Sequence, residues 1–277
     1  MQEKRREKGK ESIGEKMDIF SLTQDKKKMN ASFILKNANP VIANTLRRTI
    51  MEEVPTMAIE DVEISKNNSI LYDEIVAHRL GLLPLTTDLK SYMIRDECKC
   101  EGKGCARCQL QMTLKSKNGT VYASDIKSKD PKVVPVYPET PIVKMLKGQD
   151  IELVAYAELG RGKDHIKWSP ALVWYKYKPV IDIAQSKIKD PQEAAKLCPK
   201  GVLQVKSGKL EVNKNKLFSC DLCAACAEKN PGIKLNEKDD EFVFYIESFG
   251  QLKVKEILLK AVEMLQSNVK DFEKAIK

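Results

Sequence analysis

Cysteine placement constrains this chain more than any other feature of its sequence. The 277 residues include eight cysteines in two separated groups and only two histidines. In a reducing compartment, closely spaced cysteines favour metal binding over a disulfide framework. The sequence therefore predicts two metal sites. Their ligands are Cys98, Cys100, Cys105 and Cys108 in the first group, and Cys198, Cys220, Cys223 and Cys226 in the second.

The first group, here called the four-cysteine loop, has the short spacing of a tetrahedral thiolate site. A CxC pair that begins at Cys98 and a CxxC pair that ends at Cys108 are joined by a few residues. Gly102 and Gly104 permit the tight turn that this connection requires. Four thiolates close the coordination of a zinc ion, so we expect a structural rather than a catalytic Zn2+. Four free surface thiols are the alternative.

The second group contains the run CxxCxxC, which begins at Cys220. It is three quarters of the bacterial ferredoxin motif, in which the fourth cysteine precedes a proline and binds the other cluster of a two-cluster fold. Here Asn230 occupies the fourth position, and the pair Cys198-Pro199 supplies a Cys-Pro upstream. Positions 188, 191 and 194, which would complete a second set, hold no ligand. The pattern predicts one [4Fe-4S] cluster, with [3Fe-4S] as the form left by loss of one iron and zinc as the alternative metal.

Strand and helix patterns alternate near the N-terminal end. Residues 20–35 read as a hairpin, and Asn39 and Pro40 are a typical N-cap and first helical position. Pro55 should end this helix. An apolar stripe at four-residue spacing predicts its buried face, which consists of Ile42, Leu46 and Ile50.

The remainder of the chain predicts a mixed α+β protein. Its expected strands are 58–64, 111–114, 151–157 and 241–248, and its expected helices are 73–82, 191–197 and a long final helix. Apolar residues recur at spacings of three and four along that last helix and form a seam. Burial in its own domain and dimerisation remain alternative uses of this seam, which includes Leu258, Leu265 and Phe272.

Composition excludes several classes of protein. No stretch reaches the length of a membrane span, and residues 1–16 lack the apolar core of a secretory signal, so we expect a disordered leader and a cytoplasmic protein without membrane contact. The formal charge of +9 fits either a nucleic acid or an acidic partner surface. His78 and His165 stand in no catalytic motif, and the basic turn at 160–163 lacks the spacing of a phosphate loop. We therefore expect no catalytic residues.

Four segments carry a family resemblance. Residues 41–50 (VIANTLRRTI) and 53–59 (EVPTMAI) resemble the assembly helix of RNA polymerase subunits of the bacterial alpha type. Residues 71–85 (LYDEIVAHRLGLLPL) and 165–170 (HIKWSP) resemble the D-type subunit of the archaeal enzyme and its eukaryotic third-largest-subunit counterpart. The ferredoxin-like insertion points to the archaeal branch, because the bacterial alpha subunit lacks it.

This resemblance implies a domain plan and a set of partners. It implies a discontinuous dimerisation domain at 17–58 and 236–277, an inserted α+β domain at 59–182 that holds the four-cysteine loop, and a small ferredoxin-like domain at 183–235. It further implies a non-catalytic scaffold that pairs with subunit L, recruits the small zinc-containing subunits N and P and the second-largest, B-type subunit, and meets DNA only in the assembled enzyme. The implied interface comprises Ile42, Leu46, Arg47, Arg48, Ile50, Leu258, Leu265 and Phe272.

Two rival functions remain open on sequence grounds. A free-standing electron carrier would use the CxxCxxC run but leaves most of the chain without a purpose. A zinc-dependent nucleic-acid-binding protein would use the positive charge and the four-cysteine loop, but the chain shows no base-stacking platform or recognition-helix pattern.

Overall fold

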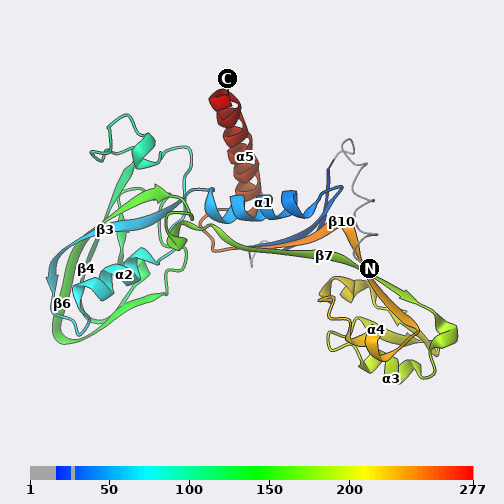
Figure 1. Cartoon of the computed structure of the whole chain (residues 1–277). Coiled ribbons are helices and arrows are strands. Elements are labelled where there is room, and N and C mark those ends of the chain that lie inside the picture. The colour runs from blue at the N-terminus through cyan, green and yellow to red at the C-terminus, as the bar shows by residue number, and fades with distance from the viewer. Residues whose placement is uncertain (1–16, 26–28, 277) are drawn as a thin grey trace. The chain divides into compact units, whose positions relative to one another are not determined.

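A computed structural model of the protein describes residues 17–25 and 29–276 (Figure 1). The expected leader at 1–16 lies outside the described residues. Internal contacts divide the chain into two compact units. One comprises the described residues up to Gln24 together with Ala31–Asn44 and Trp174–Tyr245. The other comprises Thr45–Val173 and the described residues of Asp25–Asn30 and Ile246–Lys277.

The first helix, α1 (Pro40–Glu52), begins and ends where the sequence predicts. The Asn39 side chain accepts a hydrogen bond from the backbone N–H of Ile42 at 2.9 Å, and Pro40 occupies the first helical position. The helix ends ahead of Pro55, which disfavours helical backbone in the residue before it.

A four-stranded sheet joins strands that lie far apart in the sequence. Its order is β1 (Asp18–Asp25), β2 (Asn30–Lys36), β10 (Ile233–Ser248) and β7 (Ala171–Ile183). The neighbouring β1 and β2 confirm the expected hairpin, although part of its turn lies outside the described residues. Aromatic side chains from three of these strands stack on one another. The rings of Phe33 and Tyr175 each stack on the Phe244 ring, with centroids 5.1 Å apart.

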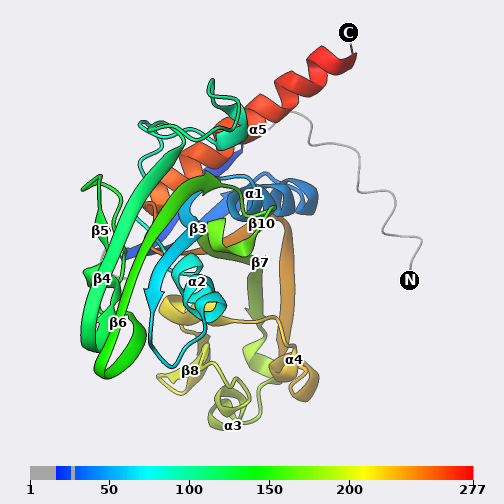
Figure 2. The same ribbon diagram turned by 90° about the vertical axis from the view of Figure 1, so that its left-hand side faces the viewer.

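A second sheet forms the core of the other unit. Its order is β3 (Thr56–Asn67), β6 (Pro141–Gly160), β4 (Gln109–Tyr122) and β5 (Lys127–Ser128), and these neighbours pair antiparallel. The helix α2 (Asp73–Gly81) packs against β3 and β6 (Figure 2). Buried side chains from the helix and the sheet close this core, among them Met57, Leu80, Met112, Leu114 and Leu153.

The segment that holds the last four cysteines is built from short elements. These are α3 (Pro191–Lys196), the two-stranded sheet of β8 (Leu203–Lys206) and β9 (Lys209–Val212), the 3-10 helix η6 (Lys214–Ser219) and α4 (Ala225–Lys229). Asp190 caps α3 by accepting hydrogen bonds from the backbone N–H groups of Gln192 and Glu193. Few side chains are buried in the apolar core here, namely Ala194, Leu203, Leu210, Cys226 and Ile233.

The last helix, α5 (Val254–Ile276), is buried only in its first two turns. Val254, Ile257 and Ala261 are buried, whereas Phe272 is 66% exposed and Ile276 is 68% exposed. Within the described part of the chain, no helix combines the length and the apolar character needed to cross a membrane.

Candidate metal centres

The four-cysteine loop leaves the 3-10 helix η2 (Arg95–Glu97) and ends where β4 begins at Gln109. Three residues between its two cysteine pairs have positive φ, namely Glu101, Gly102 and Gly104. The left-handed backbone reverses the chain within a few residues, and glycine adopts it without strain. The two glycines therefore perform the role that the sequence assigns to them.

The four sulfur atoms of this loop converge on one point. Their Sγ atoms all lie within 4.8 Å of one another. The Sγ atoms of Cys98 and Cys105 are 3.7 Å apart, and those of Cys100 and Cys108 are 3.5 Å apart. Zn–S bonds of about 2.3 Å at tetrahedral angles place the sulfur atoms about 3.8 Å apart. The donor set therefore fits a tetrahedral Zn2+ in both chemistry and spacing.

The protonation of these thiols is uneven. Burial raises the pKa of Cys108 to about 12. Burial acts in the same direction on Cys100, but hydrogen bonds with the Cys108 and Cys98 thiols outweigh it and lower its pKa to about 7. Since thiolates are the ligands of zinc, metal binding at neutral pH must release protons from this loop.

A buried carboxylate that no sequence pattern predicted braces the loop. The Arg95 guanidinium donates to the Gly102 carbonyl and to the Glu158 carboxylate, both at 2.8 Å. Gln109 donates to the same carboxylate at 3.0 Å. The Glu158 side chain is only 7% exposed, and burial raises its pKa. A strand pattern gives no signal for this contact, because Glu158 lies far from Arg95 in the sequence.

The four cysteines of the second group line one small cavity. Cys198 is half-buried and Cys223 is exposed, while Cys220 and Cys226 are buried. The cavity has a volume of about 20 Å3. Apolar side chains complete its wall, including Ile181, Leu197, Val202, Leu203 and Leu235. The sequence rule that paired Cys198 with the distant CxxCxxC run thus brings together residues that share a cavity.

Backbone conformation shapes the CxxCxxC loop beside this cavity. Leu222 and Ala224 have φ values of 55° and 60°, although neither is glycine. Alternation of left-handed and ordinary backbone gathers N–H groups into a concave nest, an arrangement found at many iron–sulfur sites. The backbone N–H of Val202 also donates to Cys198 Sγ at 3.4 Å. The donor set and its N–H groups suit an anionic iron–sulfur cluster.

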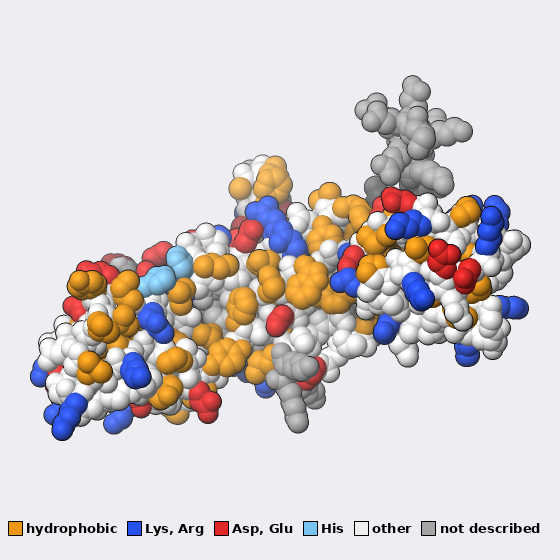
Figure 3. Space-filling model, turned by 90° about the horizontal axis from the view of Figure 1, so that it is seen from below, with side chains coloured by type: hydrophobic (Ala, Val, Ile, Leu, Met, Phe, Trp, Pro, Cys, Tyr) orange, Lys and Arg blue, Asp and Glu red, His pale blue; other side chains and the backbone are white. Residues whose placement is uncertain are grey.

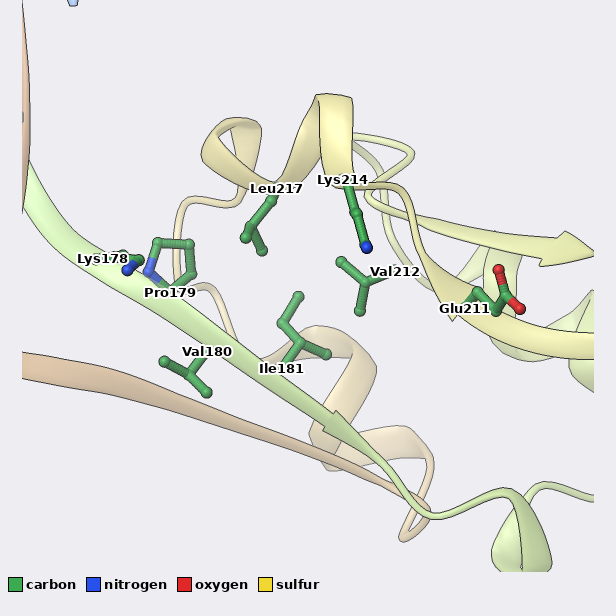
Figure 4. Close-up of a pocket in the computed structure, with 8 residues that line it drawn as sticks. All are labelled: Lys178, Pro179, Val180, Ile181, Glu211, Val212, Lys214 and Leu217. Atoms are coloured by element: carbon green, nitrogen blue, oxygen red, sulfur yellow. The ribbon is translucent and has the colours of Figure 1, made fainter. Parts of the chain in front are cut away.

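A neighbouring groove is lined mainly by apolar side chains. It has a volume of about 610 Å3 and lies along β7, β9 and η6 (Figure 4). Its lining includes Pro179, Val180, Ile181, Val212 and Leu217. No cysteine or histidine stands among the described residues of this lining, so the groove adds no soft metal ligand to the cavity beside it.

The predicted interface residues fall into two groups. Leu46 and Ile50 are buried within this chain, so their side chains serve its own core. Ile42 is 39% exposed. On α5, Leu258 and Leu265 are half-buried and Phe272 is exposed.

The two arginines of α1 have partners within the chain. The Arg48 guanidinium pairs with Glu52 at 2.9 Å, and Arg47 donates to the Met51 sulfur at 3.5 Å. Their expected contact with a large subunit stays a prediction.

His165 and the basic turn at 160–163, for which the sequence predicts no catalytic role, have structural roles. His165 Nδ1 accepts a hydrogen bond from the backbone N–H of Lys167, which caps the 3-10 helix η4 (Ile166–Trp168). In the basic turn after β6, Arg161 pairs with Glu97 and Lys163 pairs with Glu53.

Comparison with known proteins gives a consistent result. Residues 62–171 match the family model described as the RNA polymerase Rpb3/RpoA insert domain. The DNA-directed RNA polymerase subunit Rpo3 of Methanosphaera stadtmanae is 39% identical over 251 residues, which are 87% of this chain and 93% of that protein. The subunits of the same name from Methanosarcina acetivorans and Pyrococcus furiosus are 36% and 38% identical, over 92% and 90% of this chain and 96% and 93% of those proteins. The expected alpha-type inserted domain is thereby confirmed.

Proposed function

We propose that this chain, which belongs to the Rpo3 family of DNA-directed RNA polymerase subunits, acts as an assembly scaffold within that enzyme. As a member of this family, it takes part in DNA-directed transcription without supplying catalytic residues. The scaffold role, the partner subunits and the metal centres are our proposals.

The exposed seam of α5 is the observation that carries the scaffold role. Beyond its buried first turns, the helix presents apolar side chains at spacings of three, four and seven residues, which is the spacing of a helix that packs along a partner. Val262, Val269, Phe272 and Ile276 are between 46% and 68% exposed. An apolar helix face of this kind marks a protein–protein interface. Subunit L is the proposed partner, and the N, P and B subunits would join the resulting heterodimer.

The mixture of charges on one face of the molecule suits a protein partner. On the face drawn in Figure 3, lysine and arginine side chains lie among aspartates and glutamates, and exposed apolar side chains lie between them. A nucleic-acid surface gathers positive charge on one face or along one stripe. The face drawn shows no such gathering, and, in keeping with a polymerase scaffold, we propose that this chain meets DNA only in the assembled enzyme.

Substitution on the seam tests the scaffold proposal. Phe272→Asp should weaken binding to coexpressed subunit L about 100-fold, because an interface anchor of this size contributes about 2–4 kcal/mol. Ser267→Asp adds the same charge on a different side of the same helix, where the side chain is also exposed, and should leave the affinity unchanged. Equal affinity of both variants, measured by calorimetry on folded proteins, would contradict the assignment of this seam.

The shared cavity of four cysteines carries the cluster proposal. Cys198, Cys220, Cys223 and Cys226 would hold one [4Fe-4S] cluster, in a small ferredoxin-like domain at 183–235. Such a short segment has little apolar core of its own, and metal binding supplies folding free energy. The cluster therefore braces the segment. An electron-carrier role is the alternative, and reversible reduction coupled to a donor enzyme would favour it.

The four-cysteine loop carries the zinc proposal. Its sulfur spacing and closed donor set suit a structural Zn2+ within the inserted domain.

Reciprocal substitutions test the two metal proposals together. After anaerobic purification, Cys198→Ser should lose iron and keep zinc, whereas Cys98→Ser should lose zinc and keep iron. Each variant is the other's control, because both remove one thiolate from a set of four. Metal analysis by mass spectrometry gives the result, and loss of both metals from both variants would indicate general unfolding instead of two separate sites.

A further inference from the structure

Two side chains that are not ligands of the proposed cluster fasten the loop that carries Cys220 to two strands. The Lys176 ammonium group, on β7, donates to the Cys220 carbonyl at 2.8 Å. The Tyr245 hydroxyl, on β10, donates to the Phe218 carbonyl at 2.7 Å. Both bonds end on backbone oxygens within one short stretch of chain, at the start of the CxxCxxC run.

These two side chains are themselves held in place. The Lys176 ammonium lies 5.5 Å from the centroid of the Tyr245 ring, and the Trp174 ring stacks on the Tyr245 ring with centroids 5.3 Å apart. The Lys176 side chain is 21% exposed, so its charge is partly removed from water. Asp221 lies 3.6 Å from Lys176 and 3.1 Å from Lys200. The ligand loop therefore has two cations and one carboxylate beside its first cysteine.

The charge and position of Lys176 allow it to affect the proposed cluster as well as the packing of the loop. A hydrogen bond from a charged donor is about twice as strong as a neutral one, so this contact limits the movement of the Cys220 backbone. Net charge and nearby hydrogen bonds set the reduction potential of an iron–sulfur cluster. A cation close to the first ligand favours the reduced form, which carries one more negative charge. Tyr245 offers the same kind of backbone contact without the charge.

We infer that Lys176 and Tyr245 are positioning residues for the cluster: they fasten its first ligand loop to β7 and β10, and the charge of Lys176 raises its reduction potential. This inference rests on the proposed cluster. Binding of the cluster and order in the two strands then stabilise each other, because each holds the same loop in its bound position.

Three substitutions on the full-length chain, in heterodimer with subunit L, separate position from charge. Lys176→Met removes both the charge and the bond, Lys176→Arg keeps the charge, and Tyr245→Phe removes only the hydroxyl. Lys206→Met removes an exposed lysine from the end of β8 and is the matched control. We would measure the midpoint potential of the cluster by electron paramagnetic resonance, its lifetime in air, and the thermal midpoints of the cluster-loaded and cluster-free proteins.

Lys176→Met should shift the potential to a more negative value and shorten the lifetime several-fold, and Lys176→Arg should restore the potential. Tyr245→Phe should shorten the lifetime and leave the potential unchanged. In both Lys176→Met and Tyr245→Phe, the cluster should raise the thermal midpoint less than in the wild type. A purely structural role would lower the loaded and cluster-free midpoints equally and leave the potential unchanged, which would overturn the inference. A wild-type chain that takes up no iron or sulfide would instead refute the proposed cluster itself.

Discussion

At the residue scale, the two proposed metal centres differ in how their cysteines are supported. The four-cysteine loop is braced by side chains, since Arg95 links the Gly102 carbonyl to the buried Glu158 carboxylate. The second group relies on backbone N–H groups and on contacts to the carbonyls of its own loop. Supporting groups orient the ligands of a metal site, and their loss typically weakens metal binding about 10- to 100-fold.

Arg95→Met should weaken zinc binding about 10-fold or more, because the loss of a supporting partner typically has an effect of that size. The substitution also leaves Glu158 buried without its cation, so the unfolding temperature should fall. Competition with a chromophoric chelator measures the affinity. Arg79→Met removes an exposed arginine that donates to the Pro141 carbonyl at 2.7 Å in the same unit, and it serves as the control. Equal zinc affinity in the two variants would exclude a supporting role for Arg95.

Asp88 introduces a pH dependence into the stability of the same unit. Hydrogen bonds from Lys132, Ser91 and the backbone N–H of Lys90 hold the pKa of this carboxyl well below its ordinary range. The folded-state pKa of Asp88 lies below the unfolded value of about 3.9. The contribution of its carboxylate to the free energy of unfolding is therefore fully present above about pH 4, and it is lost as the pH falls through the folded-state pKa.

Asp88→Asn should therefore be less stable than the wild type at neutral pH. The difference between their free energies of unfolding, here called the gap, should become smaller below about pH 4. Urea unfolding followed by circular dichroism between about pH 3 and about pH 7 measures this gap. A gap that is independent of pH would show that the carboxylate charge contributes nothing.

At the element scale, close approach of backbones fixes how α1 meets the turn after β6. A Cβ atom at Gly162 would lie 1.9 Å from the Met51 carbonyl oxygen, which is far shorter than a carbon–oxygen contact allows. The backbone N–H of Lys163 donates to the Glu52 carbonyl at 3.1 Å and holds this approach in place. Glycine is therefore required at position 162 because a Cβ atom does not fit there, and not because of its backbone dihedral angles.

Gly162→Ala should lower the free energy of unfolding by about 2–4 kcal/mol, since the helix end must separate from the turn. Gly81→Ala is the matched control: its added Cβ would meet the Ile59 carbonyl oxygen at 3.5 Å, an ordinary contact at the end of α2. That variant should be neutral or more stable by up to about 1 kcal/mol. Equal destabilisation of the two variants, in denaturant titrations, would refute the steric argument.

At the scale of the whole molecule, the cysteines of the two proposed centres lie in different compact units. The four-cysteine loop lies within Thr45–Val173, and the second group lies within Trp174–Tyr245. Removal of each metal should therefore loosen a different part of the chain. Iron removal should increase amide hydrogen exchange at 183–235 and leave the β3–β6–β4 sheet protected, whereas zinc removal should increase exchange around the four-cysteine loop. Uniform loss of protection after either treatment would show that the units do not unfold separately.

Local signals determined much of this protein from its sequence. The cap at Asn39, the alternation of the strands and the short span of the four-cysteine loop depend on neighbouring residues, and the structure confirms the elements that they predict. The approach of Cys198 to the CxxCxxC run was predicted across a longer distance because a known motif supplied the rule. The limits of the dimerisation and cluster domains stay predictions.

Tertiary structure alone decided which side chains are buried and which distant groups meet. The stripe on α1 looks uniform in sequence, yet Leu46 and Ile50 are buried while Ile42 is exposed. The contacts of Glu158 with Arg95, and of Lys176 with the Cys220 loop, join residues from different elements. A sequence pattern records the spacing of residues along one element. Burial and long-range hydrogen bonds depend on how separate elements pack, and that arrangement exists only in the folded chain.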